Sequence, residues 1–178
     1  GAVTGTLAAT ATTGGITDSS NLSASGNVTL NDVATAGITL GTLEADANVI
    51  LTAAGNTAIT NDAALALQGA VTGTLDATAT TGDITDSDAL AVSGASVFTL
   101  GADGTNITLD SAANAFSGAV TLKAGSSGGQ TFGNIVFVDS GAIDFDSAAS
   151  ADGDLFLDGG TDNTVGGTLA VTATTGGI

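Results

Sequence analysis

Long internal repeats limit this chain to a few possible architectures. The stretch VTGTLAATATTGGITDSSNLSASG at residues 3–26 returns as VTGTLDATATTGDITDSDALAVSG at 71–94, with 18 of 24 positions identical. A third copy, VGGTLAVTATTGGI at 165–178, matches residues 3–16 at 12 of 14 positions. Such self-similarity is typical of repeat architectures, in which each unit packs mainly against its neighbours.

A shorter period, of the order found in solenoid repeats, underlies the three copies. Apolar strand starts recur regularly in one series from Val3 to Val165 and in an interleaved series from Ile16 to Ile178. By this period the copies that begin at Val3 and Val71 are three units apart, and those that begin at Val71 and Val165 are four units apart. Short runs that alternate apolar and polar residues between Gly, Asn, Asp and Ser indicate strands and turns, whereas no long stretch has helical periodicity.

The sequence therefore predicts an all-β chain, a parallel β-helix (β-solenoid) with roughly eight coils of about 23 residues over residues 1–178, as a single domain. At a rise of about 4.8 Å per coil the rod is roughly 35–40 Å long. The recurring aliphatic residues are expected to point inward and to stack from coil to coil: Val28, Val49, Val120, Ile38, Ile59 and Ile107. The alternative is a tandem array of β-sandwich modules, which use about seven strands per ~100 residues.

The amino-acid composition excludes several classes of function. The chain has 18 acidic residues, a single basic residue (Lys123), no Cys and no His, and its net charge is −17. Cys and His nucleophiles, His bases and Cys/His metal sites are thereby excluded, and no cofactor site or catalytic residue is predicted, so we expect no enzyme. So negative a chain repels nucleic acid, and no apolar run approaches the ~20 residues of a membrane span.

An acidic cluster in the second half is the best candidate for a metal site. Its members are Asp144, Asp146, Asp152, Asp154, Asp158 and Asp162. Calcium prefers several carboxylate and carbonyl oxygens at loop corners, although neither an EF-hand loop nor the nonapeptide calcium repeat is present. The alternative is a solvated acidic face that keeps the rod soluble and its sides unpaired, in which case calcium stabilises the fold little more than magnesium does.

Two further patterns have catalytic or binding interpretations. Asp18 and Asp86 occupy matching Thr-Asp-Ser motifs, which the period places three coils apart, or roughly 14 Å along the axis. This distance exceeds the separation of the two catalytic carboxylates in a glycosidase. Rows of outward Thr suggest an ice-binding face, yet coil steps of uneven length do not favour a flat lattice.

The aromatic residues and one loop set the second half apart. All six Phe lie between residues 98 and 156, and we expect them to form ring stacks in a wider core rather than an exposed aromatic surface. The glycine- and serine-rich stretch Lys123–Gln130 coincides with the longest step and is expected to protrude as a loop, where any specific binding is most readily placed.

The phrases TATTGGITDS, SGNVTLND, GTNITLDSAANAFSGAVTL and GTLAVTATTGGI resemble the repeats of filamentous-haemagglutinin-like adhesins, which are large repetitive bacterial exoproteins. The resemblance covers nearly the whole chain. It implies a right-handed β-helix shaft located outside the cell or on the bacterial outer surface, without catalytic residues in its repeats. Because the chain starts without Met, and ends at Ile178 where both earlier copies continue Thr-Asp-Ser, we expect an internal piece of a longer repetitive chain.

Three functions follow as expectations. The first is a structural extracellular shaft whose partners are the neighbouring repeats of its own chain. The second is a filament or biofilm-matrix subunit that stacks coil to coil on copies of itself, since uncapped coils expose ladder edges. The third is a carbohydrate-binding surface for host or matrix glycans, which exposed aromatic side chains on one face would favour.

Overall fold

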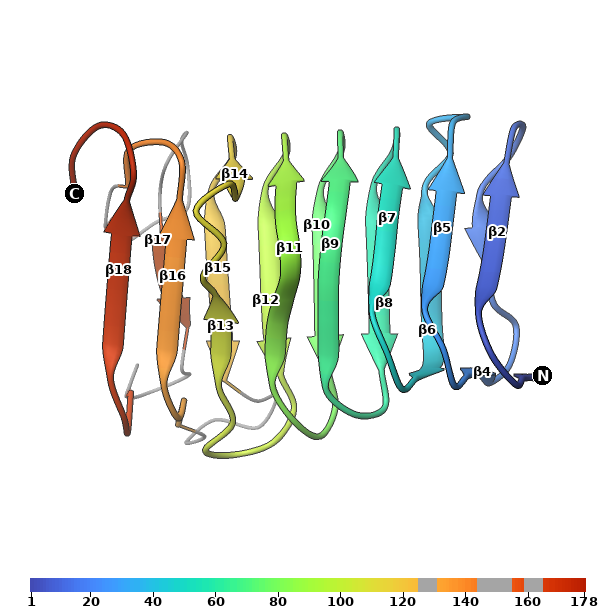
Figure 1. The fold of residues 1–178 in the computed structure, drawn as a ribbon, viewed down its shortest axis with the longest axis horizontal. Coiled ribbons are helices and arrows are strands. Elements are labelled where there is room, and N and C mark those ends of the chain that lie inside the picture. The colour runs from blue at the N-terminus through green and yellow to red at the C-terminus, as the bar shows by residue number, and fades with distance from the viewer. Residues whose placement is uncertain (125–130, 144–154, 159–164) are drawn as a thin grey trace.

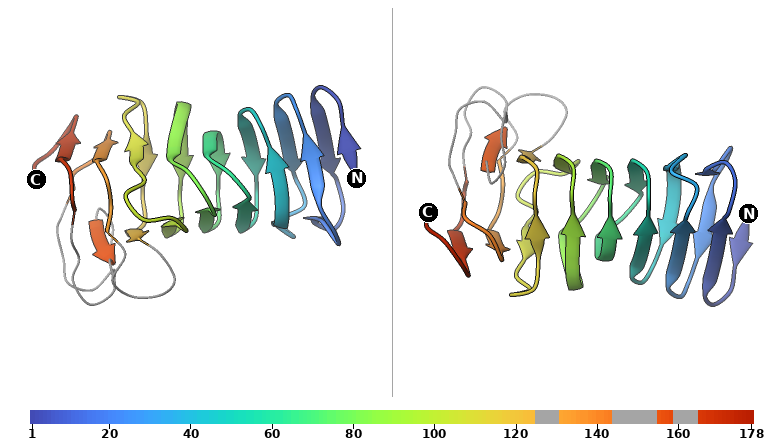
Figure 2. Two further views of the ribbon diagram at one scale, coloured as in Figure 1. Left: turned by 90° about the horizontal axis from the view of Figure 1, so that it is seen from below. Right: turned by 90° about the horizontal axis from the view of Figure 1, so that it is seen from above.

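The fold is known from a computed structural model, which describes residues 1–124, 131–143 and 165–178, and the backbone of residues 155–158. Two parallel sheets lie face to face and run the length of the molecule, with the N- and C-termini at opposite ends (Figure 1, Figure 2). We call them the near sheet and the far sheet, as they are seen in Figure 1. The described residues contain strands, turns and bends but no helix.

The near sheet contains nine strands. In chain order they are β2 (Leu7–Ala11), β5 (Val28–Asp32), β7 (Val49–Ala53), β9 (Leu65–Val71), β11 (Ile84–Val92), β13 (Ile107–Leu109), β14 (Ala115–Phe116), β16 (Ile135–Asp139) and β18 (Leu169–Ala173). Each strand pairs in parallel with the equivalent strand one coil away, and β14 shares β11 with β13.

The far sheet also contains nine strands. They are β1 (Ala2–Val3), β3 (Ile16–Thr17), β4 (Leu22–Ala24), β6 (Ile38–Ala45), β8 (Thr57–Asn61), β10 (Leu75–Ala79), β12 (Ser96–Leu100), β15 (Val120–Ala124) and β17 (Leu155–Asp158). All described pairings are parallel, so the solenoid prediction is confirmed and the alternative of antiparallel β-sandwich modules is wrong.

The winding is right-handed. The chain ascends in the near sheet and descends in the far sheet while it advances from the N-terminal to the C-terminal end (Figure 1). This is the hand that twisted parallel strands and their crossovers strongly favour.

The coils are shorter than expected over most of the rod. Leu7 pairs with Val28 and Val28 with Val49 in the near sheet, and this regular part comprises about six coils of about 21 residues. The last two steps of the near sheet, from Ile107 to Ile135 and from Ile135 to Leu169, are markedly longer. These long steps raise the mean period of the whole chain, and they bring each sheet's main path to eight strands.

The three repeat copies alternate between the two sheets. The equivalent segments Leu7–Ala11, Leu75–Ala79 and Leu169–Ala173 form β2 in the near sheet, β10 in the far sheet and β18 in the near sheet. Successive copies are therefore three and a half coils apart, and the predicted spacing of three and four whole coils is wrong. For the same reason the two valine and isoleucine series switch sheets partway, for example between Ile59 in β8 and Ile84 in β11.

The half-coil of one strand and one corner is thus the elementary unit. Strands of both sheets share the same alternation, with buried residues at every second position, as in β5 and β8. Because strands of both sheets bury every second side chain in the same way, the same sequence motif fits either sheet. Strands that stack in the same sheet are about 21 residues apart, which is one whole coil. The repeat copies are separated by an odd number of half-coils and therefore alternate between the two sheets.

The core is a continuous aliphatic stack between the sheets, and the predicted inward residues belong to it. Val28, Val49, Ile38 and Ile107 are fully buried, Ile59 is 1% exposed and Val120 is 2% exposed. Val28 pairs directly with Val49, so the predicted coil-to-coil stacking is confirmed. Burial of each such side chain contributes about 1.5–3 kcal/mol to stability.

Phenylalanine side chains join this core in the second half of the chain. Phe98, Phe116, Phe132 and Phe137 are all buried, as predicted, whereas the side chains of Phe145 and Phe156 lie outside the described residues. Phe116 meets Phe98 edge to face at 6.0 Å between ring centroids, and it meets Phe137 in a tilted arrangement at 5.2 Å. Aromatic pairs of this geometry add roughly 0.5–1.5 kcal/mol each.

Candidate functional site

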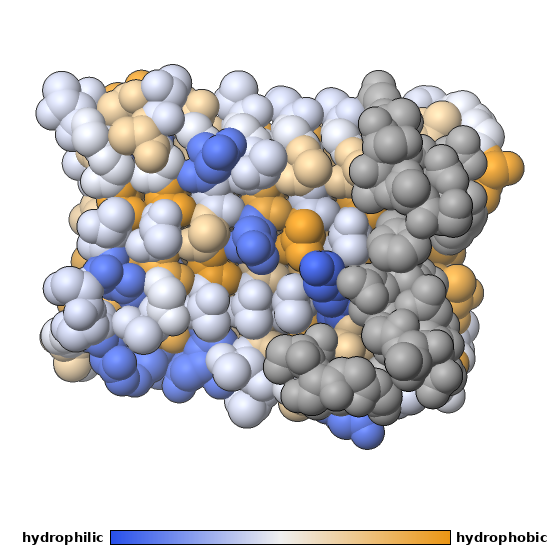
Figure 3. Space-filling model, turned by 180° about the vertical axis from the view of Figure 1, so that it is seen from behind, coloured by the Kyte–Doolittle hydropathy of each residue, from blue (hydrophilic) through white to orange (hydrophobic). Residues whose placement is uncertain are grey.

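The outer surface of the far sheet is chemically mixed. Figure 3 views this face and shows hydrophilic and hydrophobic residues side by side. One outward row has Thr60, Thr78 and Thr99 in register, followed by Lys123. The row beside it, aligned by the same pairings, is Thr39, Ala58, Asp76, Val97 and Thr121. The far sheet therefore does not present a uniform threonine face.

Asp18 stabilises a bulge in the next coil. Its Oδ1 accepts the Gly41 N–H at 2.9 Å, and its Oδ2 accepts the Thr42 N–H at 2.9 Å and the Thr42 hydroxyl at 3.0 Å. Gly41 and Thr42 lie where β6 shifts register against β8, between Leu40 and Leu43. A bulge leaves backbone N–H groups without ladder partners, and the carboxylate satisfies them.

These contacts set the ionisation of Asp18. Burial alone raises the pKa of this carboxyl, but the hydrogen bonds from the backbone of Gly41 and Thr42 and from the Thr42 hydroxyl outweigh it, so the pKa lies below its ordinary value of 3.8. The charged carboxylate is thus the form that the fold requires.

Asp86 repeats the same arrangement on the opposite sheet. Its two carboxylate oxygens accept the Asp110 N–H at 3.0 Å, the Ser111 N–H at 2.9 Å and the Asn114 side-chain amide at 2.7 Å. Because Asp86 lies in β11 of the near sheet and Asp18 follows β3 of the far sheet, the core separates the two carboxylates. The predicted separation of three coils is wrong, because the two residues lie three and a half coils apart on opposite sides of the core.

A ladder of amide and carboxylate side chains joins successive corners near the start of the near-sheet strands. Asp83 accepts the backbone N–H of Asn106 at 2.8 Å and its side-chain amide at 3.1 Å. Asn106 Oδ1 then accepts the Asn134 N–H at 2.7 Å, and Asn134 Oδ1 accepts the Thr168 N–H at 2.9 Å. The ladder thus fastens four consecutive coils at one corner.

Two fully buried asparagines close other corners. Asn61 Oδ1 accepts the Ala45 N–H at 2.8 Å, and its amide donates to the carbonyls of Ala45 at 3.2 Å and Ala64 at 2.7 Å. Asn114 accepts the Leu90 N–H at 2.9 Å through Oδ1. Asparagine tolerates the left-handed conformation that tight corners need, but the only non-glycine with positive φ among the described residues is Thr35. Asparagine serves here as a hydrogen-bonding partner instead.

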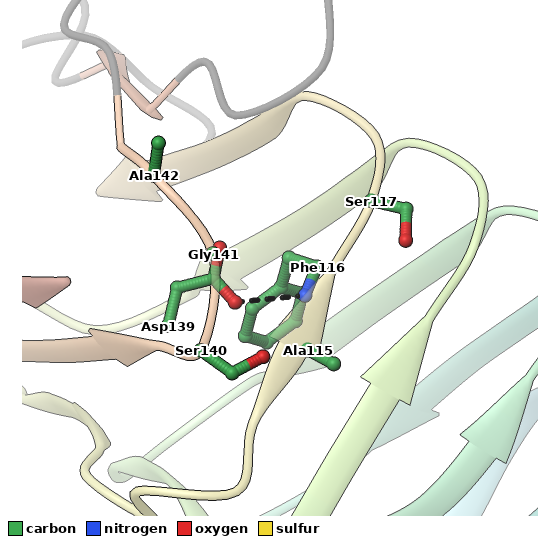
Figure 4. Close-up of a pocket in the computed structure, with 7 residues that line it drawn as sticks. All are labelled: Ala115, Phe116, Ser117, Asp139, Ser140, Gly141 and Ala142. Atoms are coloured by element: carbon green, nitrogen blue, oxygen red, sulfur yellow. Dashed lines mark hydrogen bonds between the residues drawn. The ribbon is translucent and has the colours of Figure 1, made fainter. Parts of the chain in front are cut away.

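A hollow beside β14 and β16 is lined in part by the buried residue Asp139 (Figure 4). It has a volume of about 230 Å³ and is lined by Ala115, Phe116, Ser117, Asp139, Ser140, Gly141 and Ala142. Asp139 is 2% exposed, and its Oδ1 accepts the Phe116 N–H at 3.0 Å. The carboxylate is therefore bound to the backbone of the preceding coil, as the carboxylates of Asp18 and Asp86 are bound to the backbone of the following one.

A second hollow of about 260 Å³ lies over the bulge of β6. Asn21, Thr42, Glu44, Asp62 and Thr80 are among its lining residues, and the Asn21 amide donates to the Glu44 carboxylate. Its lining carboxylates and hydroxyls offer hydrogen-bond acceptors and donors, and no positively charged side chain is among the described residues that line it.

The predicted calcium cluster cannot be placed. Asp144, Asp146, Asp152, Asp154 and Asp162 lie outside the described residues, and of Asp158 only the backbone, at the end of β17, is described. Within the described part of the chain, no group of three or more acidic side chains is arranged to hold a metal ion. Of the predicted loop, Lys123 and Ala124 end β15, and residues 125–130 lie outside the described part.

Sequence reasoning missed the hydrogen bonds from Asp and Asn side chains to the backbone of a neighbouring coil, which we call corner locks. A signal for them is nevertheless present in the sequence. Ile-Thr-Asp at 16–18 is followed one coil later by Ile-Thr-Leu at 38–40, and Ile-Thr-Asp at 84–86 by Ile-Thr-Leu at 107–109. In both cases the aspartate binds the backbone just beyond the leucine. Among the buried polar residues, Asp32, Asn61 and Asp139 are the last residues of their strands, and Asn114 directly precedes β14.

Comparison with known proteins identifies a repeat family over part of the chain. Residues 54–123 match a family described as repeats of unknown function (DUF5649). The match begins just before β8 and ends within β15, so it covers the regular coils in the middle of the rod. The comparison with curated proteins gives no match, and neither does the comparison with solved structures. In the described residues, nothing forms a helix long and apolar enough to cross a membrane.

Proposed function

We propose that this chain is a rigid structural segment, a shaft that displays or spaces adhesive parts of a bacterial surface or secreted adhesin. The observation that carries the proposal is the locking of each coil to the next at several places at once. Both sheets supply continuous parallel ladders, and Asp18, Asp86 and the ladder from Asp83 to Thr168 add bonds at the corners.

The chemistry of the described surface supports a mechanical role. Several carboxylates of the described residues accept backbone N–H groups of a neighbouring coil, as those of Asp18, Asp86 and the buried Asp139 do. A net charge of −17 keeps such rods apart from one another along their sides. The bacterial surface setting rests on the resemblance of the repeats to filamentous-haemagglutinin-like adhesins.

The location is tested with antibodies against residues 1–178 on intact cells that make the protein. We expect intact cells to be labelled, and labelling only after permeabilisation would contradict the proposal. A secreted form is recognised by the same antibodies in the culture medium.

The shaft role is tested by changing coil number without changing coil chemistry. Duplicating residues 28–48 adds one whole coil, because Leu7 pairs with Val28 and Val28 pairs with Val49. We expect the duplication to preserve adhesion, whereas Val49→Asp, which disrupts the core, abolishes it. If substitution of outward residues such as Thr78→Ala abolished adhesion while the rod stayed folded, the segment would be a binding surface instead.

A further inference from the structure

We infer that the rod carries a one-sided joint at residues 110–117, which we call the joint segment. This part of the near sheet opens while the far sheet beside it stays paired, so the rod bends here rather than in its regular coils. The inference deepens the proposed shaft, because it gives a stiff rod one point of flexion. It rests on the shaft role only for the use of the bend, since the opening is a property of the chain itself.

The near sheet is interrupted at the joint segment, where β13 and β14 together take the place of one strand (Figure 1). In the regular coils β5 pairs with β7 along its whole length, Val28–Asp32. By contrast, β13 pairs with β16 only over Ile107–Leu109, and in the described part of the chain β14 pairs with β11 alone. Between β13 and β14 the chain leaves the sheet in a turn, in which the Asn114 N–H binds the Ser111 carbonyl at 3.1 Å. The backbone ladder that joins other coils is therefore reduced here to a few bonds.

The preceding coil holds the joint segment largely through side chains. The Asp86 carboxylate accepts the backbone N–H groups of Asp110 and Ser111 and the side-chain amide of Asn114. The Asn114 side chain in turn accepts the Leu90 N–H at 2.9 Å. Asp86 is only half-buried, so water replaces its bonds when the segment lifts. A segment held by few backbone bonds is the kind that opens locally before the rest of a fold.

On the side of the following coil, free space adjoins the joint segment. Asp139 accepts the Phe116 N–H at 3.0 Å, and the Ser140 N–H donates to the Asn114 carbonyl at 2.8 Å. Beside these two bonds lies the hollow of about 230 Å³, lined by both stretches of chain (Figure 4). Because protein interiors are close-packed, a segment moves most easily where such space lies next to it.

The far sheet is continuous at the same level of the rod. There β12 pairs with β15 along its whole length, Ser96–Leu100, and β15 pairs onward with β17. Opening confined to the near sheet lengthens that side of the rod and leaves the other side unchanged, so the rod curves toward the far sheet. A few residues thus absorb the motion, as in other hinges. Whatever the shaft displays is turned in one direction.

Amide hydrogen exchange of the 178-residue chain, followed by NMR, tests the opening. Phe116 of the near sheet and Phe98 of the far sheet are matched probes, because both are buried and their ring centroids are 6.0 Å apart. We expect the Phe116 amide to exchange at least about tenfold faster than the Phe98 amide. Asp86→Ala should accelerate Phe116 by about fivefold more and leave Phe98 unchanged, whereas the matched variant Asp18→Ala, in a regular coil, should change neither. Equal exchange of the two amides in the native chain overturns the inference.

Distances between spin labels test the bend. The chain has no Cys, so two introduced Cys residues carry the only labels. Thr52→Cys with Val138→Cys spans the joint, and Thr29→Cys with Thr108→Cys spans equally many strand-to-strand steps before it. All four side chains lie on the outer side of the near sheet.

Double electron–electron resonance should give a broad distance distribution with a longer component for the pair that spans the joint, and a narrow distribution for the other pair. Equally narrow distributions overturn the joint and leave the shaft proposal standing. Absence of the protein from the cell surface and the culture medium would overturn the shaft proposal, while a broad distribution for the first pair would still support the joint.

Discussion

Asp18 and Thr42 are joined by two hydrogen bonds across successive coils, because one carboxylate oxygen accepts both the backbone N–H at 2.9 Å and the hydroxyl at 3.0 Å. The two residues are 24 positions apart in the sequence. The contact therefore holds the loop after β3 against the bulge of β6, and its charge-assisted geometry makes it one of the stronger corner locks.

Removing the Asp18 carboxylate should loosen the bulge. We expect Asp18→Ala to lower the free energy of unfolding by about 1 kcal/mol, because two backbone N–H groups lose a charged acceptor while water remains able to reach them. Urea unfolding followed by circular dichroism measures the change. Asp76→Asn, on the solvent side of β10, is the control for loss of one negative charge and should change stability by less than about 0.5 kcal/mol.

The lowered pKa of Asp18 gives a pH dependence with a definite sign. A folded-state pKa below the unfolded value stabilises the native state above the unfolded pKa, near 3.8, and the stabilisation is lost as the pH falls through the lower folded value. The stability difference between the native chain and Asp18→Asn should therefore shrink as the pH falls below about 4. The Thr131 backbone N–H and hydroxyl also lower the pKa of Asp103. The stabilisation that the Asp103 carboxylate provides should therefore be lost over the same range of falling pH. A difference independent of pH would show that the charge of Asp18 is not what matters.

Asn61 should be among the most sensitive polar positions. It is fully buried, and three backbone groups of Ala45 and Ala64 depend on its amide. Asn61→Ala leaves these groups buried without partners, so we expect a loss of about 2–4 kcal/mol in unfolding free energy. Thr60→Ala, the adjacent outward position, should cost less than about 0.5 kcal/mol. Equal losses for the two variants would contradict the role assigned to the amide.

Two glycines offer a matched test of backbone strain. Gly69 has a φ of +110°, and a Cβ there would lie 2.0 Å from the Leu51 carbonyl oxygen, whereas a Cβ at Gly41 would meet nothing within 4 Å. Gly69→Ala should therefore destabilise the rod by about 2 kcal/mol or more, and Gly41→Ala should be close to neutral. Thermal unfolding of the two variants decides the matter, and a tolerated Gly69→Ala would be inconsistent with the close stacking of β7 on β9.

The face of a strand on which a charge is placed should decide its effect. Val49 is fully buried between the two sheets, and Ile50 is its half-buried neighbour on the outer side of β7. Val49→Asp should cost several kcal/mol, because it buries a carboxylate without a partner, and Ile50→Asp should cost much less. Loss of the cooperative unfolding transition in Val49→Asp but not in Ile50→Asp is the expected readout.

The periodicity of the sequence was enough to predict the fold class and the inward-facing residues. Alternating apolar residues such as Val28 and Leu30 specify a strand with one buried side, and recurrence at a nearly constant interval requires that such strands stack on one another. The burial of Phe98, Phe116, Phe132 and Phe137 also followed, because a large aromatic ring removes much apolar area from water when it is buried. These properties depend on residues that are close in the sequence, so sequence periodicity is enough to predict them.

The sheet that each copy joins and the partners of the polar corner residues depend on how the coils stack in three dimensions. Because a half-coil fits either sheet, the phrase at Leu7–Ala11 and its copy at Leu75–Ala79 have the same pattern on opposite sides of the core, and periodicity does not distinguish three coils from three and a half. The partners of Asp18 and Asn61 belong to neighbouring coils, and the register of those coils depends on bulges and on corner lengths that vary from one coil to the next. Such contacts are set by three-dimensional stacking, because a carboxylate or amide binds whichever backbone N–H the adjacent coil brings within about 3 Å.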